Sequence, residues 1–227
     1  MINYLCIIQA RLNSSRLPSK VMLDLGGETL LERCFKSVLK SQKIDKIVVA
    51  TSNKTQDDII EDKLKLLNIE CYRGDLENVL ERFYFTALKY KAKNIIRVTA
   101  DNPLMDGYII DKLIDIYKSK EDINYSRFSN AVIGLSTEVF TFQALEKAYN
   151  STTDKYDIEH VTPYIKKNDT TYIKDIEKNY RYPNLSATID TLDDYIKMQK
   201  FYLYCQRNNI SANIENFIKY NNGEKNE

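Results

Sequence analysis

The sequence predicts an α/β protein built on a mostly parallel sheet with helices on both faces. Two observations indicate this class. Over residues 4–100, short apolar runs alternate with segments in which apolar residues recur at helical spacing. Polar clusters follow three of these runs, at the points where a strand would end. Such alternation is typical of βαβ units, whose parallel strands bring their carboxyl ends to one edge of the sheet. Ligands are therefore expected at that edge.

The first half of the chain contains four strand candidates. They are the apolar runs at residues 4–8, 46–52, 69–74 and 94–100, of which the third is the weakest. Three helical segments separate them, at residues 29–41, 57–67 and 76–91. In the first of these helices, the apolar side chains that share one face are Leu30, Leu31, Cys34, Phe35, Val38 and Leu39. Strands and helices are therefore expected to alternate as far as residue 100.

The second half is less regular and predicts a mixed extension of the sheet. A helix is expected near residues 107–119, a strand at 135–142 and a helix at 143–149. Residues 187–206 predict a strand, a turn and a helix. Neither an internal repeat nor a linker divides the chain, so we expect a single domain over residues 1–220 and a disordered tail at 221–227.

Composition places the chain among ordinary folded proteins. Of 227 residues, 43% are hydrophobic and 29% charged, and 33 Lys and Arg nearly balance 32 Asp and Glu. A formal charge of +1 gives no reason to expect a nucleic-acid partner. The cysteines show neither metal-ligand spacing nor a disulfide framework. No apolar run approaches the ~18 residues that span a membrane, and no signal peptide pattern begins the chain. We therefore expect a cytoplasmic protein without nucleic-acid or membrane partners.

The segment QARLNSSRLPSK, residues 9–20, concentrates cations directly after the first predicted strand. Arg11, Arg16 and Lys20 alternate there with small polar side chains, and Pro18 stiffens the exit. Fixed cations, hydroxyl groups and free backbone N–H groups at the end of a strand suit a polyphosphate. The segment matches neither the P-loop nor the GxGxxG pattern, so those nucleotide-binding classes are not indicated. The alternative is a solvated loop whose cations extend into water.

Two aspartates follow predicted strands and are candidates for holding Mg²⁺. Asp101 comes directly after the fourth predicted strand, and Pro103 keeps that strand from continuing. Asp190 follows a short predicted strand and precedes a helix. Mg²⁺ takes one or two protein carboxylates and completes its octahedron with water and phosphate oxygens, so the pair has suitable chemistry. Each aspartate also has a structural alternative, which for Asp190 is an N-cap. Asp193 and Asp194 are better placed to cap that helix.

The remaining candidates lie in the second half of the chain. His160 is the only histidine and stands beside Glu159. No serine or cysteine nucleophile sits in a recognisable frame beside it, so a pocket-lining or capping role is expected rather than nucleophilic catalysis. Glu138 lies in an otherwise apolar strand candidate, where it either faces water or projects into a substrate cleft.

Together these segments resemble the cytidylyltransferase family that includes CMP-Kdo synthetase and CMP-acylneuraminate synthetase, and most of all its spore-coat polysaccharide biosynthesis protein F group. IIQARLNSSRLPSKVMLDLGGETLLERC is similar to the family's opening pattern of Ala-Arg followed by Ser-x-Arg-Leu-Pro-x-Lys. RGDLENVLERF and IIRVTADNPLMD resemble the next two blocks, and GLSTEVFTFQALEKA, EHVTPYI and ATIDTLDDY follow in the order of the F group. The resemblance spans about residues 4–200. Gln9 stands where the Kdo and sialate enzymes have proline, which favours the F group and leaves the acceptor open.

The resemblance implies a Rossmann-like nucleotide-diphosphosugar transferase fold, a homodimer, and Mg²⁺-dependent transfer of CMP from CTP to a sugar acid or phosphorylated acceptor for surface polysaccharide or glycoconjugate biosynthesis. The implied nucleotide-binding residues are Gln9, Ala10, Arg11, Asn13, Ser15, Arg16, Lys20, Arg73 and Asp101. The implied catalytic residues are Arg11, Lys20, Asp101 and Asp190, of which the two aspartates hold the metal. The implied acceptor pocket contains Glu138, Glu159 and His160.

Two other functions are compatible with the same residues. A nucleotidyltransferase that uses GTP or UTP on a sugar 1-phosphate would have the same fold. A non-catalytic nucleotide-sugar-binding protein would keep the fold without transfer, although the full set of cations and aspartates argues against it. A glycosyltransferase of related fold is less consistent with the sequence, because no DxD motif occurs in it.

Overall fold

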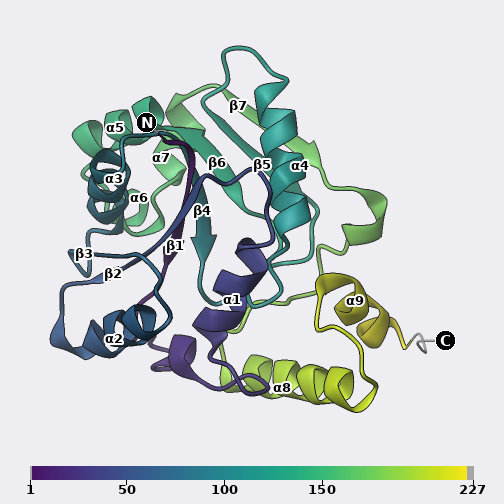
Figure 1. The fold of residues 1–227 in the computed structure, drawn as a ribbon. Helices are drawn as coiled ribbons and strands as arrows, with labels where there is room; N and C mark the ends of the chain where they lie inside the picture. The colour runs from purple at the N-terminus through teal and green to yellow at the C-terminus, as the bar shows by residue number, and fades with distance from the viewer. Residues whose placement is uncertain (1, 224–227) are drawn as a thin grey trace.

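The computed structural model describes residues 2–223, and over that range its strands form one seven-stranded sheet in the order β3-β2-β1-β4-β6-β5-β7 (Figure 1). The strands are β1 (Ile2–Gln9), β2 (Lys46–Ser52), β3 (Cys71–Gly74), β4 (Ala92–Thr99), β5 (Tyr125–Ser129), β6 (Glu138–Thr141) and β7 (Thr171–Asp175). β1 is parallel to both β2 and β4, β2 to β3, and β5 to β7. β6 is antiparallel to its neighbours β4 and β5, so it alone among the described strands runs against the rest. The predicted α/β class with a mostly parallel sheet is confirmed.

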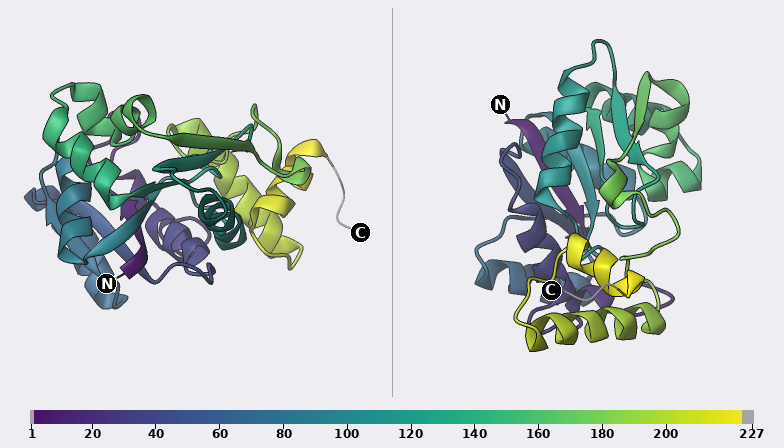
Figure 2. Two further views of the ribbon diagram at one scale, coloured as in Figure 1. Left: turned by 90° about the horizontal axis from the view of Figure 1, so that it is seen from above. Right: turned by 90° about the vertical axis from the view of Figure 1, so that its right-hand side faces the viewer.

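Helices cover both faces of the sheet (Figures 1 and 2). The α-helices are α1 (Leu30–Val38), α2 (Asp58–Leu66), α3 (Val79–Lys89), α4 (Gly107–Lys118), α5 (Phe142–Ser151), α6 (Lys155–His160), α7 (Pro163–Asn168), α8 (Leu192–Arg207) and α9 (Ile214–Asn222). The short 3₁₀ turns within residues 2–223 are η1 (Lys20–Met22), η2 (Thr55–Asp57) and η3 (Lys178–Tyr180). Apolar residues of α3, α5 and α7 pack on one face, and those of α1, α2, α4, α8 and α9 pack on the other.

The core consists of two apolar layers because side chains alternate across a strand. In β1, Cys6 and Ile8 belong to the layer under α1 and α4, whereas Leu5 and Ile7 belong to the layer under α3 and α5. All four side chains are fully buried. A strand buried on both faces is apolar throughout, which explains why the central strands were predictable as continuous apolar runs.

The loop after β1 leaves the sheet in a shape held by local hydrogen bonds. The backbone N–H groups of Ser14 and Ser19 donate to the carbonyl of Leu12 at 2.8 and 2.9 Å. The Leu12 N–H in turn donates to the fully buried carboxylate of Asp57, at 2.8 Å. Ser19 takes a left-handed conformation, with φ of 59°, and turns the chain into η1. The cation-rich loop is therefore folded against the sheet edge.

The strand expected before Asp190 is wrong. Residues 187–190 form no strand, and their backbone bonds go to loops instead: Ala187 N–H donates to the carbonyl of Ile133, and Ile189 N–H to that of Asp101. Local alternation suggested a strand, but the backbone of this segment pairs with the loops that contain Ile133 and Asp101. The structure also contains β5, β7, α6, α7 and α9, which the sequence pattern did not predict.

The C-terminal segment is helical further than the sequence suggested. α9 includes residues 221 and 222 of the expected tail, and Gly223 closes it in a left-handed conformation, with φ of 70°. Phe217 anchors α9 because its ring packs edge-on against Phe201 of α8, with centroids 5.1 Å apart. The rest of the expected tail, residues 224–227, lies outside the described residues. Within residues 2–223, the helices are all too short or too polar to cross a bilayer.

Candidate active site

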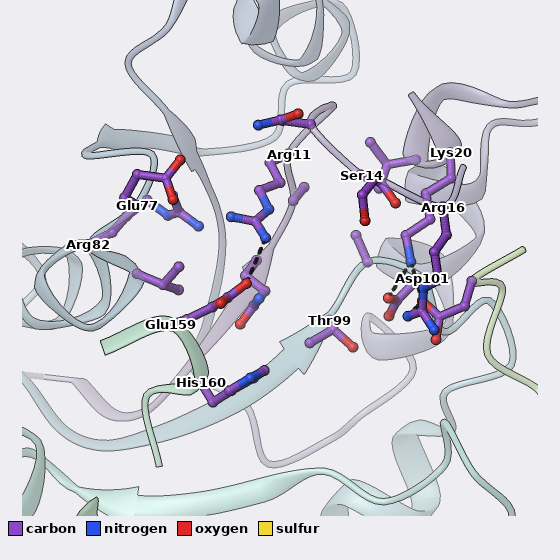
Figure 3. A pocket seen from close by; sticks show the side chains of 18 of the residues that line it. Arg11, Ser14, Arg16, Lys20, Glu77, Arg82, Thr99, Asp101, Glu159 and His160 are labelled. Carbon is purple, nitrogen blue, oxygen red and sulfur yellow. Dashed lines mark hydrogen bonds and ion pairs between the residues drawn. The ribbon is translucent and has the colours of Figure 1, made fainter. Parts of the chain in front are cut away.

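A cavity of about 550 Å³ opens at the carboxyl edge of the sheet. Small-molecule sites typically measure about 300–1,000 Å³. The walls come from segments far apart in sequence: the end of β1 with its loop, the end of β4, the start of α3, the end of α6 and the residue before Thr191 (Figure 3). This is the edge at which the βαβ pattern predicted a ligand.

Lys20 lies at the centre of an ion cluster on one side of the cavity. Its ammonium Nζ is 2.8 Å from Asp101 Oδ2 and 2.8 Å from Asp190 Oδ1. It also donates to the carbonyl of Ile189 at 2.9 Å. Lys20 is only 8% exposed, so this is a buried contact and not a pairing in solvent. The two carboxylate oxygens therefore lie within two hydrogen-bond lengths of each other.

The same cluster has features of a cation site. Arg16 adds a second contact to Asp190, with Nη2 2.9 Å from Oδ1. The other oxygen of Asp101, Oδ1, is buried and has no hydrogen-bond partner among the described residues. A buried carboxylate oxygen without a donor is costly, and a divalent cation would satisfy it. The described residues contain no group of three or more His, Cys, Asp and Glu side chains suited to a metal, so any site here rests on these two aspartates.

The opposite side of the cavity holds a second ion pair. Arg11 Nη2 lies 3.0 Å from Glu159 Oε1, which joins the loop after β1 to the end of α6 (Figure 3). His160 follows on the same helix end, and its ring packs against Tyr156 with centroids 4.4 Å apart. Both Glu159 and His160 are exposed on the cavity wall.

Arg82 is a buried cation that faces this side of the cavity from α3. It is 1% exposed, and its Nη1 donates to the carbonyl of Asp75 at 2.8 Å. Its Nε is buried without a hydrogen-bond partner among the described residues. Burial and the nearby charge of Arg11 lower the pKa of Arg82 to about 10, so the guanidinium stays protonated at neutral pH. An under-compensated cation in a cavity wall favours an anionic ligand.

Most of the residues that the sequence singled out meet in this cavity. They are Gln9, Ala10, Arg11, Asn13, Ser15, Arg16, Lys20, Asp101, Glu159, His160 and Asp190. Arg73 and Glu138 do not line it.

Arg73 is held away from the cavity by contacts with α2 and the loop before it. Its Nη1 lies 2.6 Å from Asp58 and 3.0 Å from Glu61, while Nε donates to the carbonyl of Ser52. Arg73 therefore lies apart from the cavity that holds the other residues expected to bind the nucleotide. β3 is the edge strand of the sheet, and the side chain at its end pairs with the neighbouring helix instead of reaching β1.

Glu138 is buried at the start of β6, where several polar side chains contact its carboxylate. Arg97 Nη1 lies 2.8 Å from its Oε2, and Lys166 Nζ lies 2.6 Å from its Oε1. Tyr125 and Thr162 donate to Oε1 at 2.6 and 3.0 Å. Burial alone would raise the pKa of Glu138, but the charges of Arg97 and Lys166 and these hydrogen bonds lower it to about 2. Instead of the main cavity, Glu138 lines a smaller one beside it.

The sequence of the chain matches the family model described as cytidylyltransferase over residues 5–222. The chain belongs to the cytidylyltransferase family. The resemblance noted from the motifs is thereby confirmed, and the fold described above is that of a member of a nucleotidyltransferase family.

Two relatives match this cytidylyltransferase over most of their length. It is 39% identical to an uncharacterised protein of Methanocaldococcus jannaschii over 92% of this chain and 85% of that protein. It is 34% identical to the spore coat polysaccharide biosynthesis protein SpsF of Bacillus subtilis over 93% of this chain and 92% of the relative.

Solved structures show the same fold. A cytidylyltransferase from Leptospira borgpetersenii superposes with a TM-score of 0.83 at 27% identity, over 90% of this chain and 88% of that one. CMP:2-keto-3-deoxy-manno-octonic acid synthetase, solved with CTP, superposes with a TM-score of 0.68 over 90% of this chain and 99% of its own. At 15% identity, the second similarity concerns the fold alone.

Sequence reasoning missed several side chains that face the cavity of this cytidylyltransferase. They are Glu77, Arg82, Arg97 and Thr99. Glu77 and Arg82 lie inside the block RGDLENVLERF, which had been noted only as a resemblance. Arg97 interrupts the apolar strand NIIRVTA, and a charge in a buried strand is a signal that could have identified it. Its Nε donates to Gln9 Oε1 at 3.2 Å, so it braces the start of the cation-rich loop.

Proposed function

We propose that this cytidylyltransferase transfers CMP from CTP to a sugar carrying an acid group or a phosphate, with Mg²⁺ and with release of pyrophosphate. The observation that carries the proposal is the cluster of Lys20, Asp101 and Asp190 at the end of the cation-rich loop, in a cavity large enough for a nucleotide. The fold shared with a synthetase solved with CTP supports CTP as the donor.

The cations of the loop would bind the triphosphate. Arg16 and Lys20 both contact Asp190, and Arg11 lies apart from them across the cavity (Figure 3). CTP brings about four negative charges, and fixed cations in a site that excludes water neutralise charge more strongly than they would in bulk solvent. Charge that builds on the departing pyrophosphate would be met by the same groups. The side chains therefore act by position and charge.

Asp101 and Asp190 would hold Mg²⁺. They fit this role because their carboxylates converge and because Asp101 Oδ1 is buried without a donor. When bound, Mg²⁺ neutralises phosphate oxygens and orients them. The chain's own residues would align an acceptor oxygen with the α-phosphorus, so that the new P–O bond forms as the bond to pyrophosphate breaks. This displacement requires no covalent intermediate with the protein.

The similarity to the spore coat protein SpsF supports a role in the assembly of a surface polysaccharide or glycoconjugate. We include in the proposal a cytoplasmic location, a homodimer and a single domain over residues 1–220, all from the family resemblance and the sequence pattern.

The proposal is tested by pyrophosphate release from CTP, GTP, UTP and ATP, each with Mg²⁺ and a panel of sugar acids and sugar phosphates. Release from CTP alone is expected. Asp101→Asn should lower the rate by ~10²-fold or more, the scale typical of losing a preorganised electrostatic group, and should leave the far-UV circular dichroism unchanged. Pyrophosphate release from another nucleotide would show that this nucleotide, and not CTP, is the donor. Absence of release with every pair, or full activity of the variant, would contradict the proposed mechanism.

A further inference from the structure

A second, smaller cavity of about 160 Å³ lies beside the main one. Arg97 and Thr99 line both cavities, so the two adjoin at the end of β4. The smaller cavity is below the size of a nucleotide site but has room for an acid group and a few neighbouring atoms.

The small cavity lies on the side of β4 away from the cation-rich loop. The loop follows β1, and the sheet order from there is β1, β4, β6, β5. The small cavity takes Arg97 from β4, Glu138 from β6 and Arg127 from β5. A nucleotide donor bound by the loop after β1 would therefore not occupy the small cavity. An acceptor that meets the donor at the end of β4 would extend into it.

Three charged side chains form a row across these strands. Arg97 and Arg127 are each in register with Glu138, one from either side. Glu138 is already paired with Arg97 and Lys166 and accepts two further hydrogen bonds. The carboxylate of Glu138 therefore has three cationic neighbours, Arg97, Arg127 and Lys166. It forms ion pairs with Arg97 and Lys166.

Arg127 is the cation of this row that is not paired with Glu138. Within residues 2–223, its Nε is buried without a hydrogen-bond partner, whereas the residue as a whole is only half-buried and so accessible from the cavity that it lines. Other polar groups of the cavity are satisfied internally. Asn102 Nδ2 donates to Thr99 at 2.6 Å and its Oδ1 accepts from Thr188 at 2.7 Å, while Ser136 donates to the carbonyl of Phe128 at 2.9 Å. The unmet requirement of this cavity is thus an anion.

We propose that the small cavity is the subsite for the anionic group of the acceptor, a carboxylate or a phosphate, and that Arg127 binds it. This inference rests on the proposed function in one respect, namely that the occupant is the acceptor. A buried Nε–H without an acceptor is costly, and a charge-assisted, bidentate contact of the guanidinium with an oxyanion would remove that cost. With its acid group held there, the remainder of the acceptor lies along Arg97 and Thr99 toward the main cavity. Arg127 would then determine which acceptors are used.

Direct binding is the first test. The arginine Nε–H resonances are followed by NMR while pyruvate, inorganic phosphate or neutral glycerol is added to the full chain, and Arg127 is assigned by its loss in Arg127→Gln. A saturable shift of that resonance with pyruvate indicates a carboxylate subsite, and a shift with phosphate indicates a phosphate subsite. Glycerol should have no effect. If neither anion shifts the resonance, the proposal is overturned.

Kinetics provide the second test. With an acceptor that supports pyrophosphate release, Arg127→Gln should raise its KM by ~10- to 100-fold, the range expected for one charge-assisted hydrogen-bonded contact, with CTP binding unchanged. Arg127→Lys should recover part of that loss because it restores the charge. Arg181→Gln is the matched control, since its side chain is 46% exposed and pairs with Asp175. An unchanged KM in Arg127→Gln contradicts the proposal.

The two tests separate this inference from the proposed function. Anion binding at Arg127 without pyrophosphate release from CTP would refute the transfer reaction and keep the anion subsite. Release from CTP with an unresponsive Arg127 would keep the reaction and refute the subsite.

Discussion

Lys20 shows how the partners of one side chain redefine its role. From the sequence it is the last cation of a phosphate-binding loop, and a loop lysine would contribute little to stability. In the structure it is buried and makes three contacts of 2.8 to 2.9 Å, two of them to the candidate metal ligands. Two carboxylates this close repel each other unless a cation lies between them. Lys20 therefore serves as the internal counter-ion of Asp101 and Asp190.

Lys20→Met should consequently lower the free energy of unfolding by about 1 to 3 kcal/mol, because it leaves two partly buried carboxylates without their shared partner. Excess Mg²⁺ should restore more stability to this variant than it adds to the wild type. Urea unfolding with and without Mg²⁺ measures both effects. Lys36→Met is the control, since Lys36 pairs with Glu28 on the surface. Equal stability of the variant and the wild type would show that Lys20 is not needed to neutralise the aspartates.

The lowered pKa of Glu138 predicts how the free energy of unfolding depends on pH. Its folded-state pKa of about 2 lies below the ordinary value of 4.5, so its contribution is complete above the unfolded pKa and is lost as the pH falls through the folded one. That contribution is on the order of 3 kcal/mol. The difference in unfolding free energy between wild type and Glu138→Gln should shrink as the pH falls from about 5 to 2, because protonated Glu138 resembles glutamine. Denaturant unfolding across this range, with exposed Glu121→Gln as control, measures it. A constant difference would contradict the assignment.

At the scale of elements, the cavities depend on loops that hold one another in place. α8 begins with a capping box in which Thr191 bonds the backbone N–H of Asp194, and the Asp194 side chain accepts from the Thr191 N–H. Asp194 therefore takes part in capping α8, as the sequence suggested for Asp193 or Asp194. Asp190 contacts Lys20 instead. The loop between β5 and β6 approaches the same region through Gly134, which lies against Asn102 and Thr188.

Gly134→Ala should be markedly destabilising. A Cβ there would lie 2.6 Å from both Asn102 Oδ1 and Thr188 Oγ1, and the backbone has φ of +95°. Gly27→Ala is the matched control, because its φ is +93° and nothing lies within 4 Å of its Cβ position. We expect losses of about 2 to 4 kcal/mol at Gly134 against about 1 kcal/mol at Gly27. Thermal unfolding of both variants measures the excess, and equal losses would mean that the close approach does not matter.

At the scale of the whole molecule, sheet order decides which chain segments share the site. β1 and β4 are neighbours although about ninety residues separate them, and their ends bring together the cation-rich loop and Asp101. β6 and β5 then extend the sheet and place Glu138 and Arg127 next to β4. The main cavity and the smaller one therefore follow one another along a single edge.

Ligand binding at this edge should stabilise the entire fold. CTP with Mg²⁺ at about 100 times its Kd adds about 2.7 kcal/mol, which corresponds to a rise in Tm of roughly 5 to 10 °C for a chain of this size. GTP, UTP and ATP should have smaller effects, and EDTA should reduce the rise with CTP. Differential scanning fluorimetry measures all four nucleotides. A rise that is equal for every nucleotide would indicate binding through the phosphates alone.

Local patterns in the chain were sufficient to predict the fold class and the central strands, and to single out the cation-rich loop and two aspartates that line one cavity. Buried parallel strands are apolar throughout, and a motif of several fixed residue types is specific without any knowledge of contacts. The partners of each charge were not predictable in this way. Arg73 pairs with Glu61 of α2, and Glu138 pairs with Arg97. Lys20 contacts Asp101 and Asp190, which lie more than eighty residues away in the sequence. Only tertiary structure decides such contacts, because the energy of an ion pair depends on distance and burial, and the order of strands in the sheet sets both.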